Sequence, residues 1–426
     1  MQTNFTLAQL ADPDVVESND ILRACVHCGF CTATCPTYVV LGDELDSPRG
    51  RIYLMKNMLE SGAPADVTTV KHLDRCLTCL SCMTTCPSSV HYMHLVDHAR
   101  AHVSRTFRRP LIEELTRLLL NAILPYTRRF RMALLLARFG KPFSAVLPSA
   151  WRSVLRMIPQ APPARAPAPS RPADHVGTRR VALLDGCVQP VLRPQINAAA
   201  TRLLNRRGVE VIIAPKSGCC GALSHHLSKD QTALALARAN IDAWTAEIDR
   251  GLDAIIVTAS GCGTMIKDYG HLFRNDTAYA AKAARISAHT RDITEYLAQV
   301  GLGEVTGAPA LTIAYHSACS MQHGQKIDAE PRKLLRQCGF AVREIAEAHL
   351  CCGSAGIYNL LQPEIAGALL ERKAANIQRI GAALVATGNI GCITQLQQKN
   401  LPVMHTVELL DWATGGPEPS ELSSAS

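Results

Sequence analysis

The sequence predicts an α+β multidomain protein, with a mainly helical N-terminal module followed by two homologous α/β domains that contain parallel sheets. The N-terminal quarter holds two copies of one cysteine motif, at residues 25–36 and 76–87, joined by a stretch of helical character. A second cysteine pattern recurs at a fixed offset in the C-terminal half, where apolar strands alternate with helices. A chain of 426 residues has room for this plan, because one domain usually takes about 100–200 residues.

Each N-terminal motif has the form C-x2-C-x2-C-x3-C-P, a spacing that brings three thiolates of one loop onto one metal cluster. The fourth cysteine of such a motif usually ligates the other cluster. Structural zinc sites instead pair C-x2-C knuckles at longer separation and do not need a triple followed by Cys-Pro. The sequence therefore predicts two [4Fe–4S] clusters, the first held by Cys25, Cys28, Cys31 and Cys86 and the second by Cys76, Cys79, Cys82 and Cys35.

The segment between the two motifs, RGRIYLMKNMLESG, has helical character and ends at Gly62 and Pro64. It is longer than the short β connection of a small bacterial ferredoxin. We therefore expect a mainly helical two-cluster ferredoxin module over residues 1–104, with an acidic helical lead-in before the first motif. Gly29 is expected to relieve crowding beside the first cluster, whereas Leu80 takes that place in the second motif.

Residues 105–175 are predicted to form a basic helical segment that ends in a Pro/Ala-rich linker. Residues 105–180 hold 15 Lys and Arg against 3 Asp and Glu, a net charge of +12, although the whole chain carries only +8. The run APPARAPAPSRPAD cannot hold a helix and is typical of semi-rigid linkers. We therefore expect the first α/β domain at 176–300, the second at 301–415 and a disordered tail at 416–426.

The internal repeat is found by aligning cysteines with cysteines. Three cysteines recur 132 residues later and a fourth recurs after 130 residues. Each copy contains three apolar strands, VALLDG, VEVIIAP and AIIVTAS in the first and LTIAYH, FAVREIA and ALVATG in the second. Strands that alternate with helices predict a parallel sheet, with ligands at the carboxyl ends of the strands. The repeated cysteines are Cys187, Cys219, Cys220 and Cys262 in the first copy and Cys319, Cys351, Cys352 and Cys392 in the second.

In each copy the four thiols could meet as a redox or cluster site, or they could be small buried residues that pack the loop. The spacing resembles that of the cysteine-rich CCG domain of heterodisulfide-reductase-type electron-transfer subunits, in which a final C-x-x-C completes a cluster site. Here Met265 and Gln395 stand where the last cysteine of that pattern is expected. His225, His226 and His323 are weaker candidates for ligands, because such histidines more often make polar contacts.

The remaining sequence carries no signature of substrate chemistry, so no catalytic residue is assigned. GLGEVTG at 301–307 follows a predicted helix, whereas a dinucleotide fingerprint follows a strand and opens a helix. No GxxxxGK[ST], GxSxG or HExxH pattern occurs. The basic segment offers little aromatic surface for stacking, so a nucleic-acid partner is not expected. Cys338 has no counterpart in the first copy and is predicted to be a core residue.

The first residues lack a basic region followed by an apolar one, so the protein is not expected to be secreted. The longest apolar stretches, such as Met132 to Ala137, fall short of the roughly 18–20 residues that cross a bilayer. We expect a cytoplasmic protein, held at the inner face of the bacterial cell membrane by partners or by the basic segment. Within that segment, basic side chains could meet anionic headgroups while apolar ones enter the interface. The basic residues are Arg128, Arg129, Arg131, Arg138 and Lys141, and the apolar ones are Leu134, Leu135 and Phe139.

Several blocks together carry a family resemblance. They are ILRACVHCGFCTATCPTYVVLGDELDSPRGRIYLMK, DRCLTCLSCMTTCPS, GCVQP, SGCCGA, NIDAW, TASGCG, LCCGSAGIY and NIGC. This set resembles the iron–sulfur subunits of bacterial glycolate oxidase, also called glycolate dehydrogenase. The resemblance implies a complex in which FAD-containing subunits oxidise glycolate to glyoxylate, with D-lactate as a further candidate substrate. This chain would then relay electrons toward membrane quinone and carry none of the substrate chemistry itself.

Three alternatives remain open at the level of sequence. Subunits of glycerol-3-phosphate and lactate dehydrogenases share the CCG repeat, although the CVHCGFCTATCPTY block favours the glycolate type. The CCG domains could themselves reduce a substrate, as in heterodisulfide-reductase-like enzymes, but the loss of the final cysteine argues against it. A redox sensor that uses its clusters for regulation is the third.

Overall fold

The computed structural model describes residues 1–140, 179–307, 311–419 and 422. The chain packs as two compact units. The first unit consists of Met1–Arg117 and His349–Lys373, and the second of Leu118–Ala348 and Ala374–Ser426. The predicted fold class is confirmed, since a helical N-terminal region is followed by two parallel four-stranded sheets. The predicted linker APPARAPAPSRPAD lies outside the described residues.

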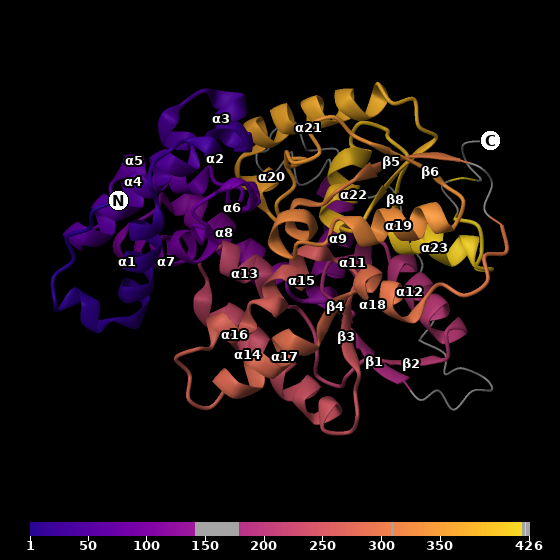
Figure 1. Ribbon diagram of the computed structural model, residues 1–426. Coiled ribbons are helices and arrows are strands. Elements are labelled where there is room, and N and C mark those ends of the chain that lie inside the picture. The colour runs from indigo at the N-terminus through magenta and orange to yellow at the C-terminus, as the bar shows by residue number, and fades with distance from the viewer. Residues whose placement is uncertain (141–178, 308–310, 420–421, 423–426) are drawn as a thin grey trace. The chain divides into compact units, whose positions relative to one another are not determined.

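The described part of the first unit is built from helices and loops and contains no strand (Figure 1). Its helices from the N-terminal segment are η1 (Gln9–Ala11), α1 (Pro13–Ala24), α2 (Phe30–Ala33), α3 (Pro36–Leu41), η2 (Glu44–Asp46), α4 (Pro48–Ser61), α5 (Val67–Asp74), α6 (Ser81–Thr85) and α7 (Tyr92–Thr106). Helix α8 (Leu111–Ile123) begins in this unit, and residues 349–373 add α20 (Tyr358–Leu361) and the start of α21 (Pro363–Gln378).

Local signals define the predicted helix between the two cysteine motifs. The Ser47 hydroxyl accepts a hydrogen bond from the Gly50 backbone N–H at 2.9 Å, and Pro48 occupies the first helical position. Both features favour a helix start. At the other end Gly62 adopts φ +62°, the left-handed conformation that usually ends a helix. The helix buries its Met55 side chain in the core of the unit with α7, so the cysteine loops at its two sides are held by one packed layer.

The second unit contains two four-stranded sheets in which every pairing is parallel. The strand orders are β2-β1-β3-β4 and β6-β5-β7-β8, so the two copies of the sequence repeat have the same topology. The strands are β1 (Arg179–Leu183), β2 (Val209–Ile212), β3 (Ala254–Val257), β4 (Thr290–Asp292), β5 (Thr312–His316), β6 (Ala341–Glu344), β7 (Leu384–Thr387) and β8 (Val403–His405).

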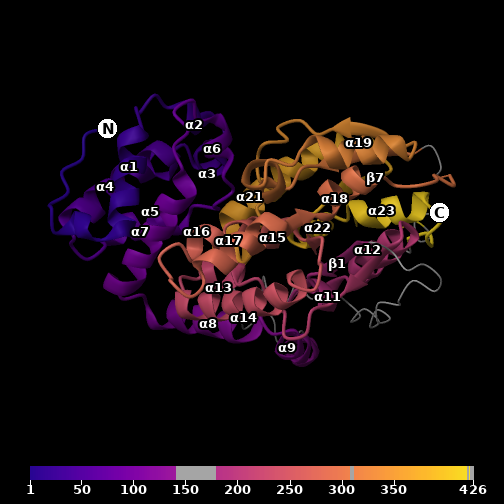
Figure 2. The same ribbon diagram turned by 60° about the horizontal axis from the view of Figure 1, so that its bottom comes forward.

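Helices connect these strands and cover the sheets. In the first sheet α14, α16 and α17 lie beside β3 in Figure 1, and Figure 2 shows the same three helices close together. Residues Trp244, Ile255 and Phe273 form part of the buried core between them. The helices are α9 (Thr127–Gly140), α11 (Gln189–Leu192), α12 (Gln195–Arg206), α13 (Ala222–His226), α14 (Asp230–Ile248), α15 (Ser260–Lys267), α16 (Tyr269–Leu272), α17 (Ala280–His289), α18 (Ile293–Val300), the π-helical turn η4 (Ser320–Gly324), α19 (Ala329–Gln337), α22 (Ile390–Gln397) and α23 (Thr406–Ala413).

Each copy has four strands in the described residues, of which the sequence pattern predicted three. Strands β4 and β8 are three residues long, and each runs directly into a helix. Three residues are too few for a period-two pattern to be recognised. Each of these helices begins with a capping box, formed by Asp292 with Glu295 and by His405 with Glu408. The capping box was the available signal for the end of each missed strand.

The carboxyl ends of the two sheets meet within the second unit. The Ser260 backbone N–H, after β3, donates to the Gly388 carbonyl, after β7, at 3.2 Å. The His405 ring Nε2 lies 2.7 Å from the Thr258 carbonyl oxygen. Burial lowers the pKa of His405 to about 4, although its hydrogen bonds to the Thr258 and Gly388 backbone act to raise it, so the ring is neutral near pH 7. The carboxyl ends of β3 and β7 therefore lie next to each other in the second unit.

Candidate metal centres

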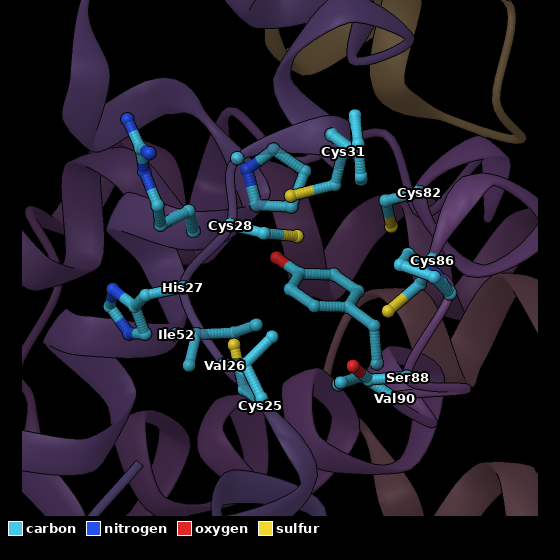
Figure 3. A pocket seen from close by; sticks show the side chains of 16 residues that line it. Cys25, Val26, His27, Cys28, Cys31, Ile52, Cys82, Cys86, Ser88 and Val90 are labelled. Atoms are coloured by element: carbon cyan, nitrogen blue, oxygen red, sulfur yellow. The ribbon is translucent and has the colours of Figure 1, made fainter.

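The first pocket of the N-terminal unit draws its cysteines from both motifs. It encloses about 450 Å³ of space that opens partly to solvent, and Cys25, Cys28, Cys31 and Cys86 all line it. Their sulfur atoms point into the same space from different sides (Figure 3). Cys25 is buried, whereas Cys28 is exposed. Three thiols of the first motif thus meet the last thiol of the second motif.

The second pocket comprises about 310 Å³ of space, part of it open to solvent, and is lined by Cys76, Cys79, Cys82 and Cys35. Here the fourth cysteine of the first motif joins the first three of the second motif. Cys82 also reaches the wall of the first pocket, so the two pockets are neighbours. In contrast with the first pocket, Cys35, Cys76 and Cys79 are all buried.

The backbone makes the same double turn around each pocket. Gly29 has φ +85° and Leu80 has φ +64°, and each precedes a short helix, α2 or α6. Two positions earlier, His27 and Thr78 also adopt left-handed conformations, at φ +55° and +52°. Such turns point successive thiols toward one centre. The sequence indicated only the glycine, because non-glycine residues rarely adopt this conformation.

Four sulfur donors per pocket match the ligand set of a [4Fe–4S] cluster. Burial raises the pKa of the Cys31 thiol to about 11, with the neighbouring Cys25 as a smaller cause. Burial also raises the pKa of Cys79 and of Cys82. Since a metal binds the thiolate, cluster binding must displace these protons, and it will be favoured as pH rises.

A buried polar network that the sequence analysis missed surrounds the second pocket. The Arg51 guanidinium is 1% exposed, and its Nε donates to the His72 carbonyl at 2.7 Å. Asp46, which is fully buried, accepts from Arg51 at 3.2 Å and from Arg75 at 2.7 Å. The His72 ring Nδ1 lies 2.9 Å from the same carboxylate. No metal-ligand spacing reveals such a network in advance, because its members come from η2, α4 and α5.

Hydrogen bonds also reach the sulfur atoms of this pocket. The Tyr92 hydroxyl donates to Cys76 Sγ at 3.6 Å, and the Thr37 hydroxyl lies 3.3 Å from Cys35 Sγ. Burial acts to raise the pKa of Cys76, but Arg51 and Arg100 outweigh it and leave that pKa below its ordinary value. Cys76 is therefore held closer to the thiolate form than Cys79 or Cys82.

Part of the second CCG copy belongs to this N-terminal unit. The Tyr358 hydroxyl donates to the Arg75 carbonyl at 2.8 Å. After burial, Cys351 is the largest cause of the raised pKa of Cys79. The segment 349–373 is therefore packed beside the second pocket.

In the first CCG copy the structure brings the four repeated thiols together. Cys219 accepts hydrogen bonds from the Cys187 and Cys220 thiols, and these bonds lower its pKa strongly. The hydrogen bond with Cys219, followed by one with Cys262 and by burial, raises the pKa of Cys220. Cys187, Cys219 and Cys220 are buried, and Cys262 is half-buried. Four convergent thiols in one buried site suit either a cluster or a dithiol redox pair.

The Cys-Cys-Gly loop of this copy is fixed by helix α14. Gly221 has φ +88°, and a Cβ atom there would lie 2.9 Å from the Ala233 carbonyl oxygen, so only glycine fits. The buried Asn240 accepts from the Gly218 backbone N–H at 2.8 Å and donates to the Cys219 carbonyl at 2.9 Å. The Tyr269 hydroxyl donates to the Cys220 carbonyl at 2.7 Å. The loop is thus held by partners on two helices.

The second copy has the same glycine constraint but different surroundings. Gly353 has φ +90°, and an added Cβ would lie 2.5 Å from the Ala366 carbonyl oxygen. Cys351, Cys352 and Cys392 are buried, and Cys319 is half-buried. At the end of β5, a ring nitrogen of His316 lies within 4.8 Å of Cys392 Sγ, and neither ring nitrogen has a hydrogen-bond partner among the described residues. Leu184 occupies the matching position of the first copy, so the repeat alignment gave no signal for His316.

The weaker candidates have ordinary surroundings. His225 lies 3.6 Å from the Asp230 carboxylate, and His323 is buried in η4. Gln395, at the position of the missing last cysteine, accepts from the Gln398 amide at 3.0 Å. Cys338 is 2% exposed at the end of α19, so its prediction as a core residue is confirmed. Burial raises the pKa of Cys338 to about 11, which keeps that thiol protonated.

Comparison with known proteins places this arrangement in a family. Residues 21–90 match the 4Fe-4S dicluster domain, and residues 181–267 and 313–397 each match the cysteine-rich CCG domain. The chain is 43% identical over 420 residues to the glycolate oxidase iron–sulfur subunit of Escherichia coli, covering 97% of this chain and 99% of that one. The chain belongs to the family of glycolate oxidase iron–sulfur subunits. It is accordingly an iron–sulfur subunit of an oxidoreductase complex with an electron-transfer role.

Other relatives match the chain at lower identity or over a smaller part of it. A probable glycolate oxidase iron–sulfur subunit of Bacillus subtilis is 32% identical over 396 residues, covering 88% of each chain. Lactate utilization protein A of Bacillus subtilis is 26% identical over 240 residues, which is 54% of this chain and 99% of that protein. A crystal structure of a hypothetical protein from Helicobacter pylori shares the fold, with a TM-score of 0.52 and 11% identity over 96% of this chain and 74% of that one.

Proposed function

We propose that this chain holds two [4Fe–4S] clusters, one in each N-terminal pocket, and relays electrons from an FAD-containing partner that oxidises glycolate to glyoxylate. The observation that carries this proposal is the exchange of cysteines between the motifs, which gives each pocket four thiols. The bound clusters would supply one-electron redox chemistry. The chain's own contribution is to hold them side by side in one helical unit, sharing the wall at Cys82.

The acceptor in this proposal is membrane quinone, and D-lactate is a further candidate substrate of the flavoprotein partner. The glycolate type is favoured over glycerol-3-phosphate and lactate dehydrogenases by the 43% identity over nearly the whole chain. A disulfide-reducing role for the CCG domains is less favoured, because Met265 and Gln395 replace the cysteine that would complete the cluster pattern.

Isolation of the native complex tests this function. We expect a co-purifying flavoprotein, glycolate-dependent quinone reduction and a brown iron–sulfur subunit. The two N-terminal motifs should account for about eight irons and eight labile sulfides per chain. An excess approaching about sixteen irons would support clusters in both CCG copies as well. Zinc in place of iron, or a flavoprotein partner without glycolate activity, would contradict the proposal.

We also propose that the segment around α9 contacts an anionic membrane surface. Arg128 and Arg129 are exposed, as are Met132 and Leu136, at 56% and 65%. A basic and apolar helix surface suits the headgroup region of a bilayer. No helix of the described residues has the length and apolar character needed to cross a membrane. Lys141 and the side chains of Arg138 and Phe139 lie outside the described residues.

Vesicle binding distinguishes this contact from docking on an acidic partner subunit. The subunit should bind anionic phospholipid vesicles in low salt, and the triple variant Arg128→Glu, Arg129→Glu and Arg131→Glu should bind them more weakly with unchanged iron content. Equal binding to neutral and anionic vesicles, or no effect of charge reversal, would favour the subunit interface.

A further inference from the structure

The two N-terminal pockets differ in the charge that the protein buries beside them. Arg51 reaches the second pocket from α4, and its Nη1 lies 3.8 Å from Cys35 Sγ. Its Nε and Nη2 are bound to the His72 carbonyl and to Asp46, so the third nitrogen is held in a fixed position toward the sulfur. A guanidinium remains charged at all accessible pH values. A permanent positive charge is therefore built into the wall of the second pocket.

The nearby carboxylate does not cancel this charge. Asp46 is the partner of Arg51, but it also forms an ion pair with Arg75 at 2.7 Å. A third guanidinium, that of Arg100, donates to the Cys76 carbonyl at 2.7 Å and to the Thr78 hydroxyl at 2.6 Å. Arg51 and Arg75 thus share one carboxylate, and Arg100 adds a third guanidinium beside the pocket. The Arg51 side chain is 1% exposed, so water screens its charge only weakly, whereas the Arg75 side chain is 26% exposed.

The first pocket also has an arginine in its wall, but that charge is neutralised. Arg49 forms an ion pair with Glu44 at 2.7 Å, and the two side chains are 34% and 46% exposed. The Arg49 guanidinium also bonds the Glu44 carboxylate strongly enough to lower the pKa of Glu44, so that group is ionised near pH 7. Solvent and the partner charge together weaken the field of Arg49 at the first pocket. The same residue type therefore has different electrostatic effects at the two sites.

We propose that the buried Arg51, supported by Arg100, gives the second cluster the higher reduction potential, which makes it the electron-accepting end of the N-terminal module. The inference rests on the proposed pair of clusters. Reduction adds negative charge to a cluster, and a nearby buried cation stabilises the reduced state, since net charge, hydrogen bonds to sulfur and solvent exposure set the potential. Burial of Cys35, Cys76 and Cys79 acts in the opposite direction, and in this proposal the fixed charge of Arg51 outweighs it. An electron exchanged between the two clusters would then be more stable on the second.

A redox titration of the full chain, monitored by electron paramagnetic resonance, tests the proposal. The probe is dithionite, with mediator dyes, and the signal of the second cluster is identified as the one altered in a Cys79→Ser variant. In the unaltered chain the second midpoint should lie above the first. Arg51→Gln should shift the reduced-to-oxidised ratio of the second cluster at least tenfold toward oxidised at fixed potential, equivalent to about 59 mV for a one-electron couple. The first midpoint should not move.

Matched variants separate the charge from a structural role. Arg51→Lys keeps the positive charge, so the midpoint potential of its second cluster should stay close to that of the unaltered chain. Arg49→Gln should leave the midpoint potential of the second cluster unchanged. Asp46→Asn removes the negative partner and should raise the midpoint potential of the second cluster, opposite to the decrease expected for Arg51→Gln. A general loosening of the pocket would not produce shifts of opposite sign in the two variants. If Arg51→Gln fails to load the second cluster, Arg100→Gln must lower the second midpoint instead. Unchanged midpoints in loaded variants, or equal shifts of both clusters, would overturn the inference. An unaltered chain without iron would instead reject the proposed function.

Discussion

The two cysteine pockets share one backbone plan and differ in what surrounds it. Both motifs turn through left-handed residues at the same places, His27 and Gly29 in one and Thr78 and Leu80 in the other. The first pocket has an exposed thiol, Cys28, and an ion pair open to solvent. The second has buried thiols and a buried guanidinium. Motif spacing therefore determines where sulfur converges, while neighbouring helices determine the dielectric and charge at that point.

The largest expected effect comes from removing one ligand of either pocket. Cys79→Ser should lower the iron content from about eight to about four per chain, because one cluster loses a thiolate. Reduction of a dye directly by the flavoprotein should persist while quinone reduction by the complex falls at least about tenfold, as expected when a relay site is lost. Iron analysis and the two assays on the intact complex measure this.

In each pocket the fourth cysteine comes from the other motif, and this arrangement predicts which cysteine variants lose the same cluster. Cys35→Ser should remove the same signal as Cys79→Ser, although the two residues belong to different motifs. Cys86→Ser should likewise remove the same signal as Cys28→Ser. If Cys35→Ser instead paired with Cys28→Ser, each motif would serve its own cluster and the pocket assignment would be wrong.

Solvent access should produce the next largest difference. Oxidative damage follows exposure of the thiolate, so the first cluster should be lost several-fold faster than the second in air. The decay of the two paramagnetic signals after air exposure and re-reduction measures the ratio. Equal decay, with both clusters initially loaded, would mean that burial of Cys76 and Cys79 does not protect the second site.

The second left-handed residue of each motif, Gly29 or Leu80, gives a smaller and purely structural test. Leu80 is 4% exposed, and its truncation to alanine should cost about 2–5 kcal/mol. Leu80→Gly should cost less, because glycine relieves about 1–2 kcal/mol of left-handed strain. Gly29→Ala should cost about 1–2 kcal/mol by introducing that strain. Thermal unfolding of the cluster-containing proteins measures the relative stability of the three variants. A Leu80→Gly variant less stable than Leu80→Ala would contradict the strain argument.

The smallest effect is expected at the exposed ion pair of the first pocket. Glu44→Gln should change the free energy of unfolding by less than about 1 kcal/mol, because exposed pairs are screened by water. The Arg49 partner lowers the pKa of Glu44 below its ordinary value of 4.5. This contribution is therefore present above that value and is lost as pH falls through the folded-state pKa. A loss that persists unchanged at low pH would indicate a role other than the ion pair.

Much of the fold could be predicted from local sequence. The helix at Pro48–Ser61 was expected from its pattern and its glycine end, and three strands of each copy were expected from apolar runs. The fourth strands, β4 and β8, were missed because three residues carry too little periodicity. The predicted domain limits and ligand sets stay predictions, as does the disordered tail at 416–426.

The sequence by itself determined the number of cysteine motifs, the repeat and the family, because spacing and order along the chain are enough to express them. Only the tertiary structure decided which charges lie beside which sulfur. Arg49 and Arg51 are two residues apart, yet Arg49 is half-buried and paired with Glu44, whereas Arg51 is buried between Asp46 and Cys35. Residues two positions apart on a helix lie on different faces of it. The packing of α4 therefore leaves the Arg49 guanidinium partly in solvent and directs the Arg51 guanidinium into the wall of the second pocket. His316 likewise has no counterpart in the first copy and came next to Cys392 only through the pairing of β5 with β7.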